Sequence, residues 1–330
     1  MKHKLLTYIT YQTFPAETAN SLQTISLLKY FAKNDFEVSL YFPLREKTSS
    51  DNIDKITEYY SLDKEFRIFG LEHNLPFGKV KFFEPLWFHI SHFLWSRKNV
   101  KDILKTIKDE GVYFTRSDWV LYFLAKKNKY VVFECHQVSK IRSFVLRKIA
   151  NKKNVKVIFL SQKLQKYYEY LNLKSIVLHS AVDSELFLET GNIKKNEKKV
   201  VFVGNLLRFG KTRGVEFLIK AFSQYKNLKD YSLEIIGGPK NEAERLKNLI
   251  IKEKIKNISI TGRLDRKSTI KKIKESSIGI LINSDESSHS TEFTSPLKYF
   301  EYIFAELDVV AVDFPSHREL PNSEFIKYFK

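Results

Sequence analysis

Short apolar runs alternate with segments of helical periodicity along the chain, and this alternation limits the fold more than any other feature. Strand-like runs lie at 5–9, 36–42, 112–115, 130–134, 155–160, 176–178, 200–203, 233–236, 258–261, 278–282 and 309–312. In the second half, helical patterns lie between them at 215–225, 242–252, 268–275 and 296–304. Strands that alternate with helices predict parallel sheets covered by helices on both faces.

The chain is long enough for two such domains. It has 330 residues, and a domain with a single hydrophobic core rarely exceeds about 250–300 residues. A charged stretch at 191–199 precedes a restart of the pattern at 200–203. We therefore expect an N-terminal domain at 1–192 and a C-terminal domain at 193–330. Open α/β sheets bind ligands at the carboxyl ends of their strands, so the loops there are the places to look for chemistry.

The positive charge is uneven along the chain. The formal net charge is +18, and residues 101–200 alone hold 21 Lys and Arg against 10 Asp and Glu. Such a surface suits anionic lipid headgroups, phosphorylated substrates or nucleic acid. A lysine-rich chain can also simply reflect genome composition, and composition alone does not separate these explanations.

Cysteine content fits a reducing compartment, and hydropathy predicts neither a membrane span nor a signal peptide. Cys135 is the single cysteine, so no disulfide can form within the chain. No run of about 18 apolar residues occurs, and the first apolar run is too short for a signal peptide. We expect a cytoplasmic protein, either soluble or peripheral on the inner face of a membrane.

The stretch TEFTSPLKYFEY at 291–302 has the features of an anion-binding helix start. Thr294 or Ser295 suits the N-cap, and Pro296 suits the first helical position, where free N–H groups attract an anion. Lys298 and Glu301 are three residues apart and share one side of the helix. They could hold the phosphate and the ribose of a nucleotide; an ordinary helix start with a surface ion pair is the alternative.

A second candidate phosphate loop, VGNLLRFGKTRGV at 203–215, follows a strand-like run and opens a helical one. Its glycines would let the backbone approach a phosphate, and Arg208, Lys211 and Arg213 would neutralise it. The loop is neither a Walker A motif nor a G-x-G-x-x-G fingerprint. A flexible basic loop is the alternative.

Several ordered motifs together resemble glycosyltransferase family 4, the retaining GT-B enzymes, in the branch with SPLK-x-x-E. They are VFVGNLLRFGKTRGVEFLIKAF, SLEIIGG, ISITGRL and SPLKYFEY, preceded by TFPAETANSLQTISLLKYFAKNDFEV, YFTRS, VVFECHQ and LHSAVDSELF. The resemblance implies two Rossmann-like domains whose parallel sheets face a central cleft. It implies acceptor binding by the first domain and nucleotide-sugar binding by the second. Family members continue past the run at 309–312 into closing helices, so we expect the second domain to be truncated at Lys330.

The resemblance also assigns donor-site residues. Arg213 would contact the donor diphosphate, with Arg208 or Lys211 as a second cation, and Glu301 would bind the ribose. The first glutamate of the family motif would fall at Phe293, a departure from the pattern. The implied donor-binding set is Arg208, Lys211, Gly238, Arg263, Ser295, Pro296 and Glu301.

In the first half, the resemblance points to three polar positions and one histidine. His136 matches a family histidine that faces the transferred sugar. Arg116, Asn20 and Ser21 are the acceptor-side candidates. A structural role for His136, a surface ion pair for Arg116 and helix capping by Asn20 or Ser21 are the alternatives.

The implied reaction is metal-independent transfer with retention, without a cofactor, from a nucleotide-diphosphate sugar to a glycan or lipid-linked acceptor. We expect same-face attack, with Arg213 and Lys298 stabilising the leaving diphosphate and His136 orienting the sugar. A nucleotide-sugar epimerase of the same architecture and a basic nucleic-acid-binding protein are the rivals. We do not expect nucleic-acid binding, because no such motif occurs.

The segment 76–98 holds seven Phe and Trp residues among cations and histidines. A helix here would place Leu86, Ile90, Phe93 and Leu94 on one side. That side could enter an anionic membrane interface or hold a lipid-linked acceptor. The alternative is a core helix packed on the first sheet.

Overall fold

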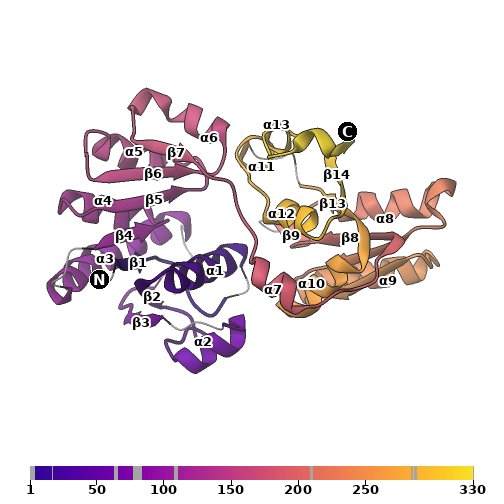
Figure 1. Cartoon of the computed structure of the whole chain (residues 1–330), viewed down its shortest axis with the longest axis horizontal. Coiled ribbons are helices and arrows are strands. Elements are labelled where there is room, and N and C mark those ends of the chain that lie inside the picture. The colour runs from indigo at the N-terminus through magenta and orange to yellow at the C-terminus, as the bar shows by residue number, and fades with distance from the viewer. Residues whose placement is uncertain are drawn as a thin grey trace. The chain divides into compact units, whose positions relative to one another are not determined.

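The structure is a computed structural model that describes residues 4–16, 18–62, 66–76, 84–107, 111–208, 211–283, 285 and 288–329. The chain forms two compact units, Met1–Leu160 with Leu164–Leu178 and Ser161–Lys163 with His179–Lys330 (Figure 1). Residues 179–191 belong with the second unit, because the Ser180 N–H donates to Ser295 Oγ at 3.1 Å and Phe187 lies in the second unit's core. The domain boundary at 192/193 stays a prediction.

The first unit is built on a seven-stranded parallel sheet in the order β3-β2-β1-β4-β5-β6-β7. Its strands are β1 (Lys4–Ile9), β2 (Phe36–Leu44), β3 (Arg67–Glu72), β4 (Val112–Thr115), β5 (Val131–Cys135), β6 (Val155–Phe159) and β7 (Ser175–Val177). Its helices are α1 (Ala19–Lys33), α2 (Ile53–Tyr60), α3 (Glu84–Thr106), α4 (Asp118–Lys126), α5 (Lys140–Ile149), α6 (Gln162–Tyr167) and the 3₁₀ turn η1 (Glu169–Leu171).

The strands of the first sheet carry apolar side chains on both faces, which pack against the surrounding helices. β1 lies inside it, with Leu6 opposite Val38 of β2 and Val112 of β4. Leu6, Val38 and Leu40 are buried with α1 residues such as Ile25 in one core cluster. Parallel strands covered on both faces read as continuous apolar runs, which is why β1 and β2 are visible in the sequence.

The second unit is built on a six-stranded parallel sheet in the order β12-β11-β8-β13-β14-β15, with a separate hairpin of β9 and β10. Its strands are β8 (Asn196–Val203), β9 (Leu207–Arg208), β10 (Lys211–Thr212), β11 (Ser232–Ile236), β12 (Ile258–Gly262), β13 (Ser276–Leu281), β14 (Asp308–Val312) and β15 (Lys327–Phe329). Its helices are α7 (Ser184–Glu189), α8 (Val215–Gln224), α9 (Lys240–Lys252), α10 (Arg266–Lys274), α11 (Ser288–Glu292), α12 (Leu297–Phe304) and α13 (Pro315–Arg318), with 3₁₀ turns η2 (Lys226–Leu228) and η3 (Ser323–Phe325).

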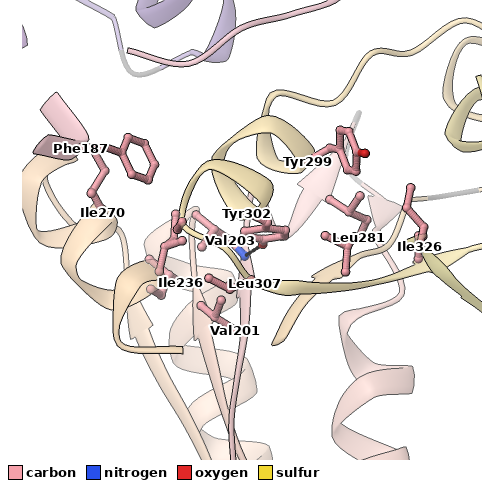
Figure 2. Packing of buried hydrophobic residues seen from close by; sticks show 14 of the residues in the cluster. Phe187, Val201, Val203, Ile236, Ile270, Leu281, Tyr299, Tyr302, Leu307 and Ile326 are labelled. Atoms are coloured by element: carbon pink, nitrogen blue, oxygen red, sulfur yellow. Dashed lines mark hydrogen bonds between the residues drawn. The ribbon is translucent and has the colours of Figure 1, made fainter. Parts of the chain in front are cut away.

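One core cluster of the second unit fixes α12 on its sheet. Figure 2 shows Tyr302 of α12 packed close to Val203 and Leu307 in this cluster. The Val203 N–H donates to the Tyr302 hydroxyl at 3.0 Å. A Cβ at Gly279 of β13 would lie 2.4 Å from the Tyr302 ring, so the ring needs a glycine beneath it. This contact holds the start of α12 at a fixed place relative to β8 and β13.

The structure confirms the expected fold class of two Rossmann-like α/β units with parallel sheets. Two edge strands were not predicted. β3 is half-exposed and contains Gly70, and β15 is only three residues long, so neither has a continuous apolar run. Within the described ranges, no helix has both the length and the apolar character needed to cross a bilayer.

Candidate functional site

Glycines bring two strand ends of the second unit unusually close together. A Cβ at Gly237, after β11, would lie 1.8 Å from the Gly204 carbonyl oxygen, after β8. The Gly204 N–H donates to the Ile236 carbonyl at 3.0 Å, and the Leu206 N–H donates to the Gly238 carbonyl at 2.8 Å. Only glycine fits at position 237, whereas a Cβ at Gly204 would lie 3.4 Å from its nearest atom. The result is a low backbone edge at the carboxyl ends of β8 and β11, where α/β sheets bind ligands.

Arg213 lies next to this edge. Gly214 takes a left-handed backbone (φ 80°) and is the N-cap of α8 directly after Arg213. The Arg213 Nη2 donates to Asn283 Oδ1 at 2.8 Å, and Asn283 follows β13. The Arg213 Nη1 lies 3.8 Å from the position of a Cβ on Gly204. The predicted diphosphate cation is therefore held among the ends of β8 and β13.

Arg208 and Lys211 form part of the β9–β10 hairpin through their backbones. Their side chains lie outside the described residues. Their predicted role as a second diphosphate cation stays a prediction.

Arg263 closes the other end of the same edge. Its Nε would lie 2.9 Å from a Cβ on Gly238, so the guanidinium lies directly over this glycine. Its Nη2 donates to Asn205 Oδ1 at 3.0 Å. The sequence placed Gly238 and Arg263 near the donor, and the structure brings them into contact with each other.

The start of α12 differs from the sequence prediction. The helix begins at Leu297, Pro296 is the N-cap, and neither Thr294 nor Ser295 caps it. The physical reason is that Ser295 is buried and engaged elsewhere: its Oγ accepts from the Ser180 N–H, and its carbonyl accepts from Ser180 Oγ at 2.9 Å. The Tyr299 N–H donates to the Pro296 carbonyl at 3.0 Å, and helix geometry leaves the N–H groups of Leu297 and Lys298 without partners inside the helix, so the anion-attracting end remains.

Glu301 is wholly buried between two cations. Lys298 Nζ lies 2.6 Å from Glu301 Oε2, and Arg266 Nη2 lies 2.6 Å from Glu301 Oε1. Burial alone would raise the pKa of Glu301, but Arg266 and Lys298 lower it below its usual value. Burial lowers the pKa of Lys298 against the pull of Glu301, and Arg266 lowers it further. The trio carries a net charge of +1 at the start of α12, and because Glu301 is fully buried a ribose hydroxyl can reach its carboxylate only if a covering side chain moves.

In the first unit, three side chains form a buried network at the ends of β4 and β5. Arg116 donates to both oxygens of Glu134, from Nε at 2.9 Å and from Nη2 at 3.1 Å. Its Nη1 donates to the Asn20 carbonyl at 3.2 Å and to Thr24 Oγ1 at 3.3 Å. The guanidinium is thus used within the fold, and it ties α1 to β4 and β5.

His136 joins this network as a neutral ring. Its Nε2 lies 2.9 Å from Glu134 Oε1. Burial lowers the pKa of His136, and the Arg116 charge lowers it further. Burial alone would raise the pKa of Glu134, but Arg116 and His136 hold it at about 2. The carboxylate accepts from Nε2–H, which leaves Nδ1 as a hydrogen-bond acceptor.

The two remaining acceptor-side candidates lie in the first turn of α1. Thr18 is the N-cap, and its Oγ1 accepts from the Ser21 N–H at 3.1 Å. Ser21 is buried with its hydroxyl 2.8 Å from Thr18 Oγ1, whereas the Asn20 side chain is exposed. Of the two, only Asn20 is open to a ligand in this state.

No group of three or more His, Cys, Asp or Glu side chains that could hold a metal ion occurs among the residues that the structure describes.

Comparison with known proteins adds to this geometry. Residues 197–325 match the family model described as Glycosyl transferases group 1. An uncharacterized glycosyltransferase of Methanocaldococcus jannaschii is 29% identical over 209 residues, or 62% of this chain and 46% of that protein. The chain thus spans less than half the length of that relative.

Solved structures match over almost the whole chain. A sucrose-phosphate synthase from Thermosynechococcus elongatus has a TM-score of 0.68 at 14% identity, covering 98% of this chain and 85% of that one. The fold is GT-B. A glycosyltransferase from Rickettsia africae has a TM-score of 0.67 at 18% identity, covering 100% of this chain and 85% of that one. WaaG, a glycosyltransferase involved in lipopolysaccharide biosynthesis, has a TM-score of 0.59 at 12% identity, covering 98% of this chain and 85% of that one.

Within this GT-B fold, the matched stretch 197–325 contains the whole glycine-lined edge and the start of α12. Sequence reasoning missed Arg266, Asn205, Asn283 and Glu134. Each acts through a partner far away in sequence, such as Asn283 for Arg213. Only Glu134 had a local signal, since it lies two residues before His136 in a buried strand.

Proposed function

We propose that this chain is a retaining glycosyltransferase that moves a sugar from a nucleotide-diphosphate sugar to a glycan or lipid-linked acceptor in surface-polysaccharide synthesis. One observation carries the proposal. The glycine-lined edge of the second unit has Arg213 on one side. Lys298 and Glu301 at the start of α12 form a trio with Arg266 of α10 that carries a net positive charge. Bare backbone and fixed cations suit a diphosphate.

The donor would bind in pieces along this edge. The diphosphate lies at Arg213 and the N–H groups at the start of α12, where Lys298 adds charge. The base lies near Gly238 and Arg263, which already contact each other. Because Glu301 is fully buried, ribose binding requires a covering side chain such as Lys298 or Arg266 to move.

The reaction breaks the bond between the anomeric carbon and the diphosphate oxygen. The acceptor oxygen forms its bond to that carbon on the same face, and its proton passes to the departing phosphate oxygen. Charge grows on the leaving diphosphate, and preorganised cations stabilise it. Arg213 and Lys298 are the proposed catalytic cations, and the neutral His136 ring orients the sugar through a hydrogen bond. No metal ion and no cofactor takes part in the proposed step.

The acceptor and the location are also part of the proposal. The first unit would bind the acceptor, with Asn20 as the exposed polar side chain at the start of α1. The involvement of the structural neighbour WaaG in lipopolysaccharide biosynthesis supports a surface-glycan acceptor. We place the protein in the cytoplasm, in contact with the inner face of the membrane.

Thermal unfolding with UDP, GDP, ADP and their common sugar conjugates tests the donor site. A ligand at one hundred times its dissociation constant stabilises a protein by about 2.7 kcal/mol. We expect one nucleoside diphosphate and its sugar conjugate to raise the unfolding temperature. The matching conjugate, incubated with acceptor glycans, should give a product with the donor's anomeric configuration by NMR. No shift with any nucleotide would overturn the proposal, and an inverted product would overturn retention.

A further inference from the structure

Exposed apolar side chains lie on α3 and α5, the two helices that pack against α4. In α3, Leu86, Ile90 and Leu94 recur at intervals of four residues, with exposed fractions of 60%, 38% and 40%. In α5, Phe144 is 43% exposed and lies 6.4 Å from the Trp119 ring of α4. In the first unit, α4 packs against α3 and against α5 (Figure 1). We call the exposed surface of these three helices the α3–α5 face.

Exposed cations occur along or just after the same three helices. They are Arg97, Lys98, Lys101, Lys126, Lys127, Lys140, Arg147 and Lys148. Lys148 Nζ lies 5.8 Å from the centre of the Phe144 ring. The acids of these three helices are Glu84, Asp102 and Asp118, and Asp118 is bonded to the buried Arg142 at 2.7 Å. The α3–α5 face is therefore strongly positive.

A hollow of roughly 470 Å³ opens at one end of this face, beside the first turn of α5. Its lining includes Ser139, Lys140, Ser143, Phe144, Arg147 and Tyr167. Two cations and two hydroxyls between aromatic walls suit a phosphate that carries an apolar or polyol group. Val138, also in the lining, is two residues beyond His136, so the hollow lies near the strand end that bears the proposed sugar-binding histidine.

We propose that the α3–α5 face binds the surface of an anionic phospholipid bilayer, with one headgroup phosphate in the hollow. The inference extends the proposed function by naming its membrane partner. Apolar side chains at intervals of four with cations around them are the pattern of an interfacial helix. Nucleic acid would gain little from Leu86, Ile90 and Leu94, because bases stack on aromatic rings. A second copy of the same positive face would be repelled.

Co-sedimentation of the full chain with vesicles tests this proposal. We expect binding to phosphatidylcholine–phosphatidylglycerol vesicles and little binding to pure phosphatidylcholine. The triple variant Lys140→Gln, Arg147→Gln, Lys148→Gln should bind about 100-fold more weakly, because each lost cation near an anionic surface costs about fivefold. The control Lys220→Gln, Lys226→Gln, Lys229→Gln removes the same charge from exposed positions of the second unit and should bind like the unchanged protein.

A second variant separates apolar from electrostatic contributions. Leu86→Ser, Ile90→Ser, Leu94→Ser keeps every charge. Because Ile90 and Leu94 are only 38% and 40% exposed, the variant should fold with a modestly lower unfolding temperature while losing vesicle binding. Three outcomes would overturn the proposal. The protein binds both vesicle types equally, the control variant at 220, 226 and 229 loses as much vesicle binding as the α5 variant, or an oligonucleotide displaces the protein from the vesicles. Nucleotide binding by the same preparations reports on the donor site independently, so failure of one proposal is distinguishable from failure of the other.

Discussion

The Glu301→Gln substitution tests how the trio at the start of α12 is held. It removes the negative charge between Lys298 and Arg266, each 2.6 Å from one carboxylate oxygen. The Glu301 side chain has no exposure, whereas Lys298 and Arg266 are 25% and 18% exposed. Breaking a fully buried ion pair costs about 3–5 kcal/mol. Since both cations keep some solvent, we expect the lower end, about 3 kcal/mol of unfolding free energy.

Urea unfolding at neutral pH measures this loss as a lower midpoint with an unchanged slope. The control is Glu244→Gln, because Glu244 pairs with Lys247 at 3.1 Å but is 51% exposed; it should change stability by less than about 0.5 kcal/mol. A double variant with Lys298→Met should recover part of the loss, because only one cation is then left unpaired. If Glu301→Gln unfolds like the control, the trio does not hold α12 and the reasoning is wrong.

The pH dependence of the same transition gives an independent check. The pKa of Glu301 is lowered in the fold from its usual value of 4.5. Its stabilising contribution is therefore complete above that value and is lost as the pH falls through the lower folded pKa. Unchanged protein should lose stability over this acidic range more steeply than Glu301→Gln. Parallel curves would contradict the assignment.

Two further substitutions test the remaining geometry. Glu134→Gln should cost about 3 kcal/mol at neutral pH, because a carboxyl pKa lowered from 4.5 to about 2 corresponds to roughly that energy; its stability curve should be flatter between these pH values, and equal slopes would contradict the network. Gly237→Ala should cost about 2–3 kcal/mol in urea unfolding, because its Cβ would meet the Gly204 oxygen at 1.8 Å, whereas Gly204→Ala, with its nearest atom at 3.4 Å, should cost far less. Equal effects would refute the close approach of these strand ends.

Sequence reasoning anticipated where some candidate residues lie in the fold, because their signal was local, and their roles stay predictions. Arg213 and Lys298 lie next to strand ends or helix starts that the apolar pattern already marks, and the structure puts both at the carboxyl-end region of the second sheet. Gly237, after β11, gave a second local signal, because only glycine allows such close backbone contact.

Tertiary partners account for what the sequence did not predict. Ser295 looked like an N-cap, but its hydroxyl oxygen accepts a hydrogen bond from the N–H of Ser180, 115 residues away. Glu301 looked like an exposed ribose ligand, but Arg266 reaches it from the first residue of α10. Arg116 looked open to an acceptor, but Glu134 and the Asn20 carbonyl use its guanidinium. No spacing rule reports such contacts, since they depend on which helices the sheet order brings together.

The most direct test of the central claim is nucleotide binding by Arg213→Ala beside Arg245→Ala. Arg245 is a 49%-exposed arginine of the same unit that pairs with Glu242 at 2.7 Å. Since charge-assisted hydrogen bonds contribute about 1.5–3 kcal/mol, Arg213→Ala should bind the preferred nucleoside diphosphate about 10- to 100-fold more weakly in calorimetric titration. Arg245→Ala should bind it like the unchanged protein. Equal affinity for both variants would contradict a diphosphate site at the glycine-lined edge.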